Sequence, residues 1–238
     1  MPSPQPALGS NVAAFEEGMN QLKTAAIIMI IAAILTGVGA LASVTTFFAG
    51  LTTSPALAMA RISAGIAVAD MLGGVIVLVA TFLCLIKAFD KLKEFNPGKF
   101  STPATIVKIG FPAYGAMAII APIAVYATVT QLLSSGAPSF VTAQQVVGTL
   151  QTVNALAFIA KAVAMLGIGI GTYYIYEVTD EGLFLAAAIL FLIAVFVSLL
   201  APVAWILVIA GAGNAVNKVR ASYAAQTQQA GTPLTEGP

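Results

Sequence analysis

Three polar side chains share one long apolar segment and are the first candidates for chemistry. Lys161 lies in the apolar run 146–175, with Asn154 seven residues and Gln151 ten residues before it. At 100° per residue these positions fall within a helical stripe about 80° wide. A bare ammonium in hydrocarbon costs about 3 kcal/mol or more, so Lys161 must be paired, neutral or in contact with water. The stripe predicts either a polar pathway or interhelical hydrogen bonds inside a membrane bundle.

Asp70 is the acidic residue that lies well inside an apolar run, so it is the natural partner for this lysine. Arg61 precedes it by nine residues, which places the two on opposite faces of one helix. The stem of Arg61 can instead reach the membrane interface. We therefore expect Asp70 and Lys161 to meet between helices, as a structural ion pair or as part of a proton or ion relay.

The composition excludes most other chemistry. The chain has no histidine and one cysteine, Cys84, so the commonest metal ligand is missing and no internal disulfide can form. No nucleophile–base arrangement and no glycine-rich phosphate loop after a strand can be assembled. We expect no catalytic residue, no metal and no cofactor, and hence no enzyme. A net charge of +1 also gives no indication of nucleic-acid binding.

The elements that must position these residues are helices in a lipid bilayer. Of the 238 residues 59% are hydrophobic and 8% are charged, whereas a soluble domain has about 25% charged residues. Five apolar blocks follow one another, and each exceeds the roughly 20 residues that span a bilayer. They cover about residues 24–50, 56–88, 106–133, 141–176 and 183–212. We predict an all-α integral membrane bundle of about five long helices.

The same pattern divides the chain into a polar or amphipathic segment (1–23), a transmembrane domain (24–217) and a polar tail (218–238). The fifth block could also be two short spans that meet near Pro202. We favour a single span, because residues 200–203 offer no polar side chain to satisfy the backbone of a turn in lipid.

Small residues and prolines are expected to shape the packing of these helices. Gly167 and Gly171 form a GxxxG pattern, which allows two helix backbones to approach closely. Pro122 and Pro202 lie inside apolar blocks, where a proline removes a backbone hydrogen bond and kinks a helix.

The basic residues predict the orientation. Five of the ten lie between Lys87 and Lys108, so this connection is expected on the cytoplasmic side of the cell membrane. With five spans the tail would then lie outside. Lys218 and Arg220 would instead favour the cytoplasm, which six spans would suit.

Both ends of the chain carry a resemblance. Residues 18–26 form a Gly-x-x-x-Leu-Lys segment that enters an isoleucine-rich span at 27–31, and residues 173–211 run from a tyrosine-containing helix end to an alanine-rich span that closes on glycine. These stretches resemble a family of archaeal polytopic membrane proteins of unknown function. Met19 stands where that family usually has leucine, and Ala25 where it has glycine. The resemblance implies a multi-span helical bundle in an archaeal plasma membrane, and no activity.

Two classes of function remain. The first is a non-catalytic structural or accessory subunit, bound to itself or within a larger membrane complex, which the small-residue faces favour. The alternative is a small-solute or ion transporter or channel, which Lys161, Asp70 and the polar stripe favour. A water-filled cavity that reaches Lys161 would support transport, whereas a dry contact between Asp70 and Lys161 would support a scaffold.

Overall fold

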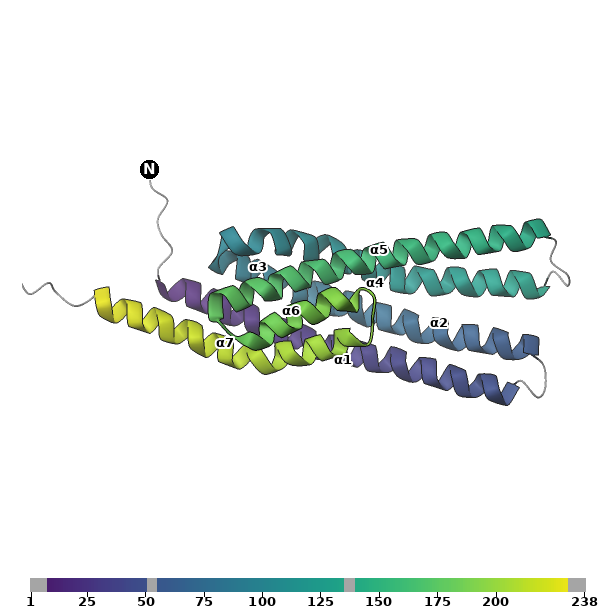
Figure 1. Cartoon of the computed structure of the whole chain (residues 1–238), viewed down its shortest axis with the longest axis horizontal. Coiled ribbons are helices and arrows are strands. Elements are labelled where there is room, and N and C mark those ends of the chain that lie inside the picture. The colour runs from purple at the N-terminus through teal and green to yellow at the C-terminus, as the bar shows by residue number, and fades with distance from the viewer. Residues whose placement is uncertain (1–7, 51–54, 135–139, 231–238) are drawn as a thin grey trace, which may run out of the picture.

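The computed structural model describes the backbone of residues 8–50, 55–134 and 140–230. Its elements are α1 (Leu8–Gly50), α2 (Pro55–Ala80), a π-helix η1 (Thr81–Leu85), α3 (Ile86–Phe95), α4 (Pro97–Ser134), α5 (Phe140–Thr179), α6 (Gly182–Ala194) and α7 (Leu200–Ala230) (Figure 1). Five helices are long and apolar enough to cross a membrane, at 11–39, 65–95, 97–128, 147–179 and 200–228. The all-α bundle predicted from the sequence is confirmed.

Four long antiparallel rods form the frame of the bundle. They are α1, the continuous helix α2–η1–α3, α4 and α5. A single residue, Asn96, separates α3 from α4, and its side-chain oxygen accepts a hydrogen bond from the Lys99 amide at 3.2 Å. Pro97 follows at the first position of α4, where a missing N–H costs nothing. The Asn-Pro-Gly sequence thus forms a helix cap and reverses the chain in one step.

The fifth apolar block folds as a helical hairpin. Helix α6 has 13 residues and is about 20 Å long, less than the roughly 30 Å of a hydrocarbon core. The chain reverses over residues 195–199, and α7 returns toward the end from which α6 came (Figure 1). The prediction of a single span here was wrong. The break also lies at Val195–Leu199, before Pro202 rather than at it.

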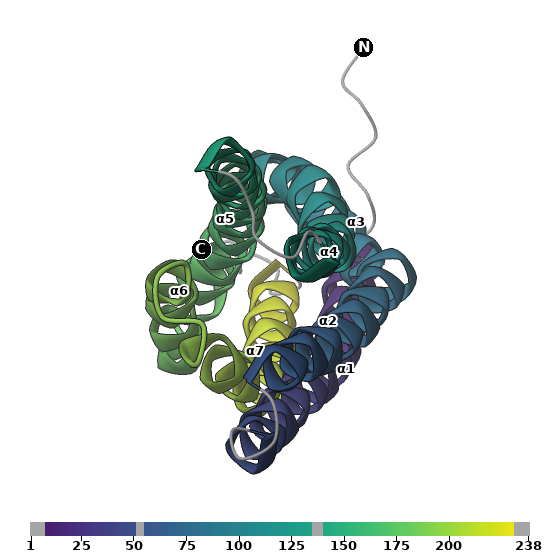
Figure 2. The same ribbon diagram turned by 90° about the vertical axis from the view of Figure 1, so that its right-hand side faces the viewer.

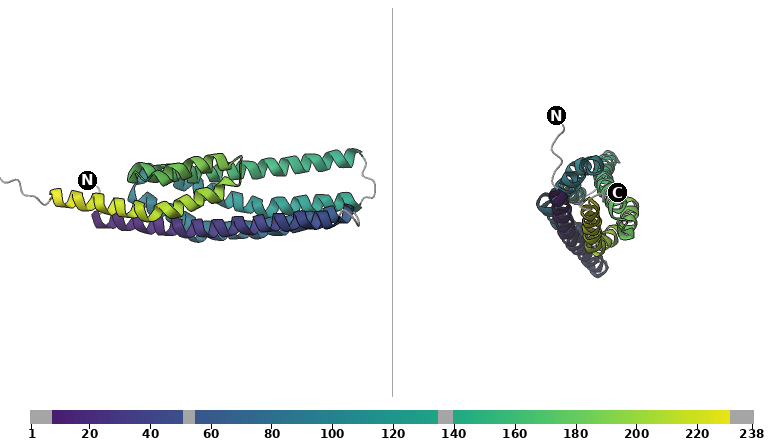
Figure 3. Two further views of the ribbon diagram at one scale, coloured as in Figure 1. Left: turned by 60° about the horizontal axis from the view of Figure 1, so that its bottom comes forward. Right: turned by 90° about the vertical axis from the view of Figure 1, so that its left-hand side faces the viewer.

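The helices close a ring when the molecule is viewed along its length. Contacts run from α1 to α2, α4, α5, α6, α7 and back to α1 (Figure 2). The hairpin contributes to this ring over only part of its length, because α6 and α7 meet at a tip near the middle of the bundle (Figure 3). Beyond the tip α1, α2, α4 and α5 continue without it.

The hairpin changes the predicted topology. The start of α1 and the end of α7 lie at the same end of the bundle as the α3–α4 connection (Figure 3). Side-chain contacts agree, since the Phe95 ring packs against both Phe15 of α1 and Tyr223 of α7, with centroids 4.8 and 6.4 Å apart. The expectation that the tail lies opposite the lysine-rich connection was therefore wrong. We call the end that holds this connection the charged end and the other the distal end.

Candidate functional site

Lys161 of α5 caps the tip of the hairpin. Its Nζ donates a hydrogen bond to the backbone oxygen of Val195 at 3.0 Å and another to the Ser198 hydroxyl at 2.7 Å. Val195 is the residue that ends α6. The last carbonyls of a helix lack intrahelical donors and carry partial negative charge, so an ammonium there is favourable. Lys161 therefore makes polar contacts inside an otherwise apolar segment.

This cap explains why the chain can turn within an apolar block. Backbone bonds from Phe196 to Ile193 and from Leu200 to Val197, both 3.0 Å, satisfy part of the turn. Ser198 and the distant Lys161 supply polar side chains for the rest. The predicted single span rested on the absence of polar side chains at residues 200–203 alone. The turn instead obtains its polar side chains from Ser198 and Lys161.

Asp70 of α2 does not pair with Lys161. The described ion pairs do not include it, and the amine of Lys161 is engaged at the hairpin tip. The side chain of Arg61 lies outside the described residues. The predicted Asp70–Lys161 ion pair is wrong, because the hairpin provides the lysine with other acceptors.

Asp70 instead lines a half-open cavity of about 500 Å³ between the helices of the bundle. Its wall includes the polar side chains of Thr36 and Tyr114. The hairpin tip contributes Ser198 and Pro202 to the lining. A mostly apolar cavity of this size with a few polar groups is typical of a small-molecule site. Through Ser198, the cavity reaches the group that Lys161 binds.

An aromatic cluster underlies the cavity. The Trp205 ring of α7 packs edge-on against Phe111 of α4 and Phe191 of α6, with centroids 6.4 and 4.8 Å apart. All three side chains are buried, while Phe111 and Trp205 also line the cavity. These rings fill the space between the cavity and the interior of the hairpin.

The polar stripe predicted on α5 is not continuous. Gln151 and Asn154 are exposed, and neither belongs to the cavity lining, although Ala157 does. Of the three residues, only Lys161 contacts the hairpin.

The predicted glycines lie at close helix contacts within the chain. A Cβ on Gly167 would lie 2.9 Å from Ile106 Cγ2 of α4, and one on Gly171 would overlap the Phe89 ring of α3. Gly110, which sequence analysis did not single out, lies closer still to backbone, since its Cβ would be 2.8 Å from the Ala164 amide nitrogen. A single glycine in an apolar helix gave no usable sequence signal for this contact.

The two predicted proline kinks have different outcomes. Pro122 lies inside α4 and lines the cavity. Pro202 is the third residue of α7. Residues in the first turn of a helix have no carbonyl four positions earlier in the helix to bind, so a proline there is tolerated and starts the helix instead of kinking it.

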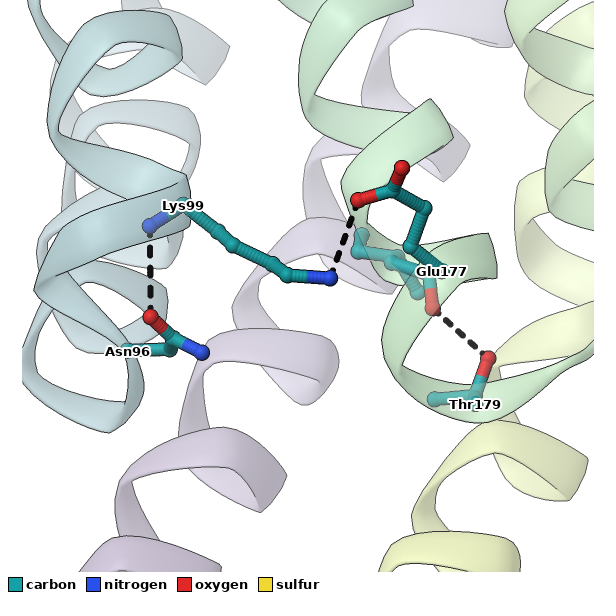
Figure 4. Close-up of polar contacts among 5 residues, drawn as sticks. Asn96, Lys99, Glu177 and Thr179 are labelled. Atoms are coloured by element: carbon teal, nitrogen blue, oxygen red, sulfur yellow. Dashed lines mark hydrogen bonds and ion pairs between the residues drawn. The ribbon is translucent and has the colours of Figure 1, made fainter.

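The lysine cluster forms ion pairs at the charged end. Lys99 of α4 binds Glu177 of α5 at 2.9 Å, close to the Asn96 cap and to Thr179, whose hydroxyl donates to the Ile175 carbonyl (Figure 4). Similar pairs join the other helices: Lys91–Glu17, Lys108–Asp90, Lys218–Glu181 and Arg220–Glu16. These side chains are partly exposed, so each pair contributes little stability but fixes which helix ends are neighbours.

Sequence analysis also missed the π-helix. Thr81 begins η1, and its buried hydroxyl donates to the Val77 carbonyl at 2.7 Å. In a π-turn the backbone N–H groups bind carbonyls five residues earlier instead of four. The Thr81 hydroxyl is then a further donor to the carbonyl four residues earlier. A threonine in an apolar run was the available signal, but threonine has the same local bond in ordinary helices.

The fold thus has the features of a multi-pass helical membrane protein, with five sufficiently long apolar helices and a carboxylate in a cavity between helices. The chain belongs to the family described as "Protein of unknown function (DUF973)", which matches residues 16–237. Comparison with curated proteins and with solved structures found no match. This family, like the one that the two ends of the chain resemble, has no known function. The archaeal origin of the protein stays a prediction.

Proposed function

We propose that this protein is a membrane transporter that binds a small solute in the cavity beside the hairpin tip. The observation that supports it is the Asp70 carboxylate, which lines a cavity of about 500 Å³ and has no basic partner among the described side chains. The Asp70 side chain is half-buried within an apolar segment, where a carboxylate is costly, and such residues generally mark solute or ion pathways.

The hairpin supports the same proposal. Many transporters bind their solute near the middle of the membrane, where interrupted helices leave backbone groups and helix ends facing the site. Here the interruption at 195–199 borders the cavity through Ser198 and Leu199, and the start of α7 borders it through Ala201. The proposed solute site therefore lies where the turn at 195–199 borders the cavity that Asp70 lines.

We favour a transporter over an accessory subunit because several of the small-residue faces that suggested a partner protein pack within the chain. These glycines pack against other helices of the same chain: Gly39 against Ala69, Gly73 against Thr36, Gly110 against Ala164, and Gly171 against Phe89. Packing within the bundle accounts for these four glycines without a partner protein, and this supports the proposal.

The proposal requires water to reach the cavity, and two neighbouring positions of α4 test this. Ala121 lines the cavity, whereas Ile120 is exposed on the outer surface and would face lipid. In a background with Cys84→Ser, we expect Ala121→Cys to react with a membrane-impermeant maleimide in proteoliposomes. Ile120→Cys, at nearly the same depth, should stay unlabelled.

An unreactive Ala121→Cys in a folded protein would show that the cavity is closed to water and would contradict transport. Purification in mild detergent followed by mass spectrometry then tests the accessory-subunit alternative, which requires a stoichiometric partner or a defined homo-oligomer.

A further inference from the structure

We propose that the solute is a lipophilic organic cation with a single positive charge, held by Asp70 as its counter-ion. This inference rests on the proposed function and names the class of molecule that the cavity would take. It follows from the charge of the lining, the kinds of side chain around it and the volume of the cavity.

The charge balance of the cavity favours a cation. Asp70 contributes a carboxylate, and the partner predicted for it from the sequence, Lys161, donates its hydrogen bonds to Val195 and Ser198. An anionic solute would be repelled by Asp70. A monovalent cation would supply the missing positive charge in a setting of low dielectric constant, where charge pairs interact strongly.

The remaining lining suits an apolar body around that charge. Three aromatic rings, those of Phe111, Tyr114 and Trp205, border the cavity, and aromatic rings are favourable surroundings for a cation. Three methionines also line the cavity, one each from α1, α4 and α5, and their flexible thioethers adapt to irregular shapes: Met29, Met117 and Met165. Aromatic rings, methionines and one carboxylate together match an organic ammonium or phosphonium ion.

The volume and ligand types disfavour a bare metal ion. A cavity of about 500 Å³ is within the 300–1,000 Å³ range of drug-sized ligands. The described residues contain no cluster of three or more histidine, cysteine or acidic side chains that could hold a metal. The space is instead filled by a molecule with several apolar groups.

The single tryptophan of the chain provides a reporter, because Trp205 lines this cavity. We would titrate the purified protein in nanodiscs with tetraphenylphosphonium and follow Trp205 emission. The matched control is tetraphenylborate, which has nearly the same size and shape but the opposite charge. We expect a saturable change with the cation and none with the anion.

Asp70→Asn keeps the shape of the side chain and removes its charge. It should weaken tetraphenylphosphonium binding by about tenfold or more, because a close charge pair is worth well over the free energy of a factor of ten. Equal responses to the two ions, or an unchanged affinity in Asp70→Asn, would overturn the inference. The comparison of the two ions needs no variant, so it holds even if Asp70→Asn does not fold. A reactive Ala121→Cys combined with no cation preference would reject this solute class and leave the proposed transport intact.

Discussion

The ammonium of Lys161 donates to a helix-terminal carbonyl and to a hydroxyl, and neither acceptor carries a full charge. The carbonyl at the end of α6 has a partial negative charge that the helix dipole enhances. A lysine can therefore stabilise a turn inside an apolar bundle without a carboxylate partner.

Replacing Lys161 tests whether its hydrogen bonds stabilise the hairpin turn. Lys161→Met keeps the length of the side chain but leaves the Val195 carbonyl without this donor. We expect the free energy of unfolding to fall by about 1–3 kcal/mol, the usual cost of an unsatisfied buried polar group. Thermal unfolding in detergent measures the change.

Lys161→Arg serves as the control, since a guanidinium can still donate to both acceptors. It should retain most of the stability. If Lys161→Met were as stable as the unmodified protein, the hairpin tip would not depend on this cap.

At the scale of elements, the spacing between α4 and α5 depends on Gly110. Its α-carbon faces the backbone of Ala164, so a methyl group there would meet main-chain atoms that cannot rotate away. We expect Gly110→Ala to lower the free energy of unfolding by about 1–3 kcal/mol through overpacking. Gly213→Ala in α7 is the matched control, because nothing lies within 4 Å of its added Cβ.

The control should be neutral or raise stability by up to about 1 kcal/mol, since alanine favours a helix more than glycine does. Denaturation of both variants in one detergent compares them directly. Equal effects from the two substitutions would mean that α4 and α5 are not in close backbone contact at Gly110.

Most elements could be predicted from hydrophobicity alone. The apolar blocks match the helices, and Asn96 with Pro97 marks the α3–α4 turn from local chemistry. The hairpin could not be predicted in this way, because its turn is completed by a lysine 34 residues earlier in the chain. Asp70 was recognised as unusual, but its surroundings depend on how four helices and the hairpin come together.

At the scale of the whole molecule, the hairpin places the end of α7 beside the start of α1. The Arg220–Glu16 ion pair joins these two segments directly. Every described ion pair lies at this charged end, so most of the described charged side chains are concentrated there. By the positive-inside rule we expect the charged end in the cytoplasm.

Cysteine labelling of intact cells tests this orientation. Three exposed positions are suitable in the Cys84→Ser background: Ser134 at the distal end, and Thr102 and Gln226 at the charged end. We expect an impermeant thiol reagent to label Ser134→Cys from outside, and to label the other two only after permeabilisation. If only Gln226→Cys were labelled from outside, the C-terminal tail and the lysine-rich connection would lie on opposite sides of the membrane.

The cap at the hairpin tip also has a consequence for biogenesis. A 13-residue arm is too short to insert as an ordinary span, so it needs a preassembled surface to enter. Lys161 is synthesised 34 residues before Val195, which at about 5–20 residues per second is roughly 2–7 s earlier. The ribosome therefore delivers the donor first, and α5 can act as a template on which the later hairpin folds.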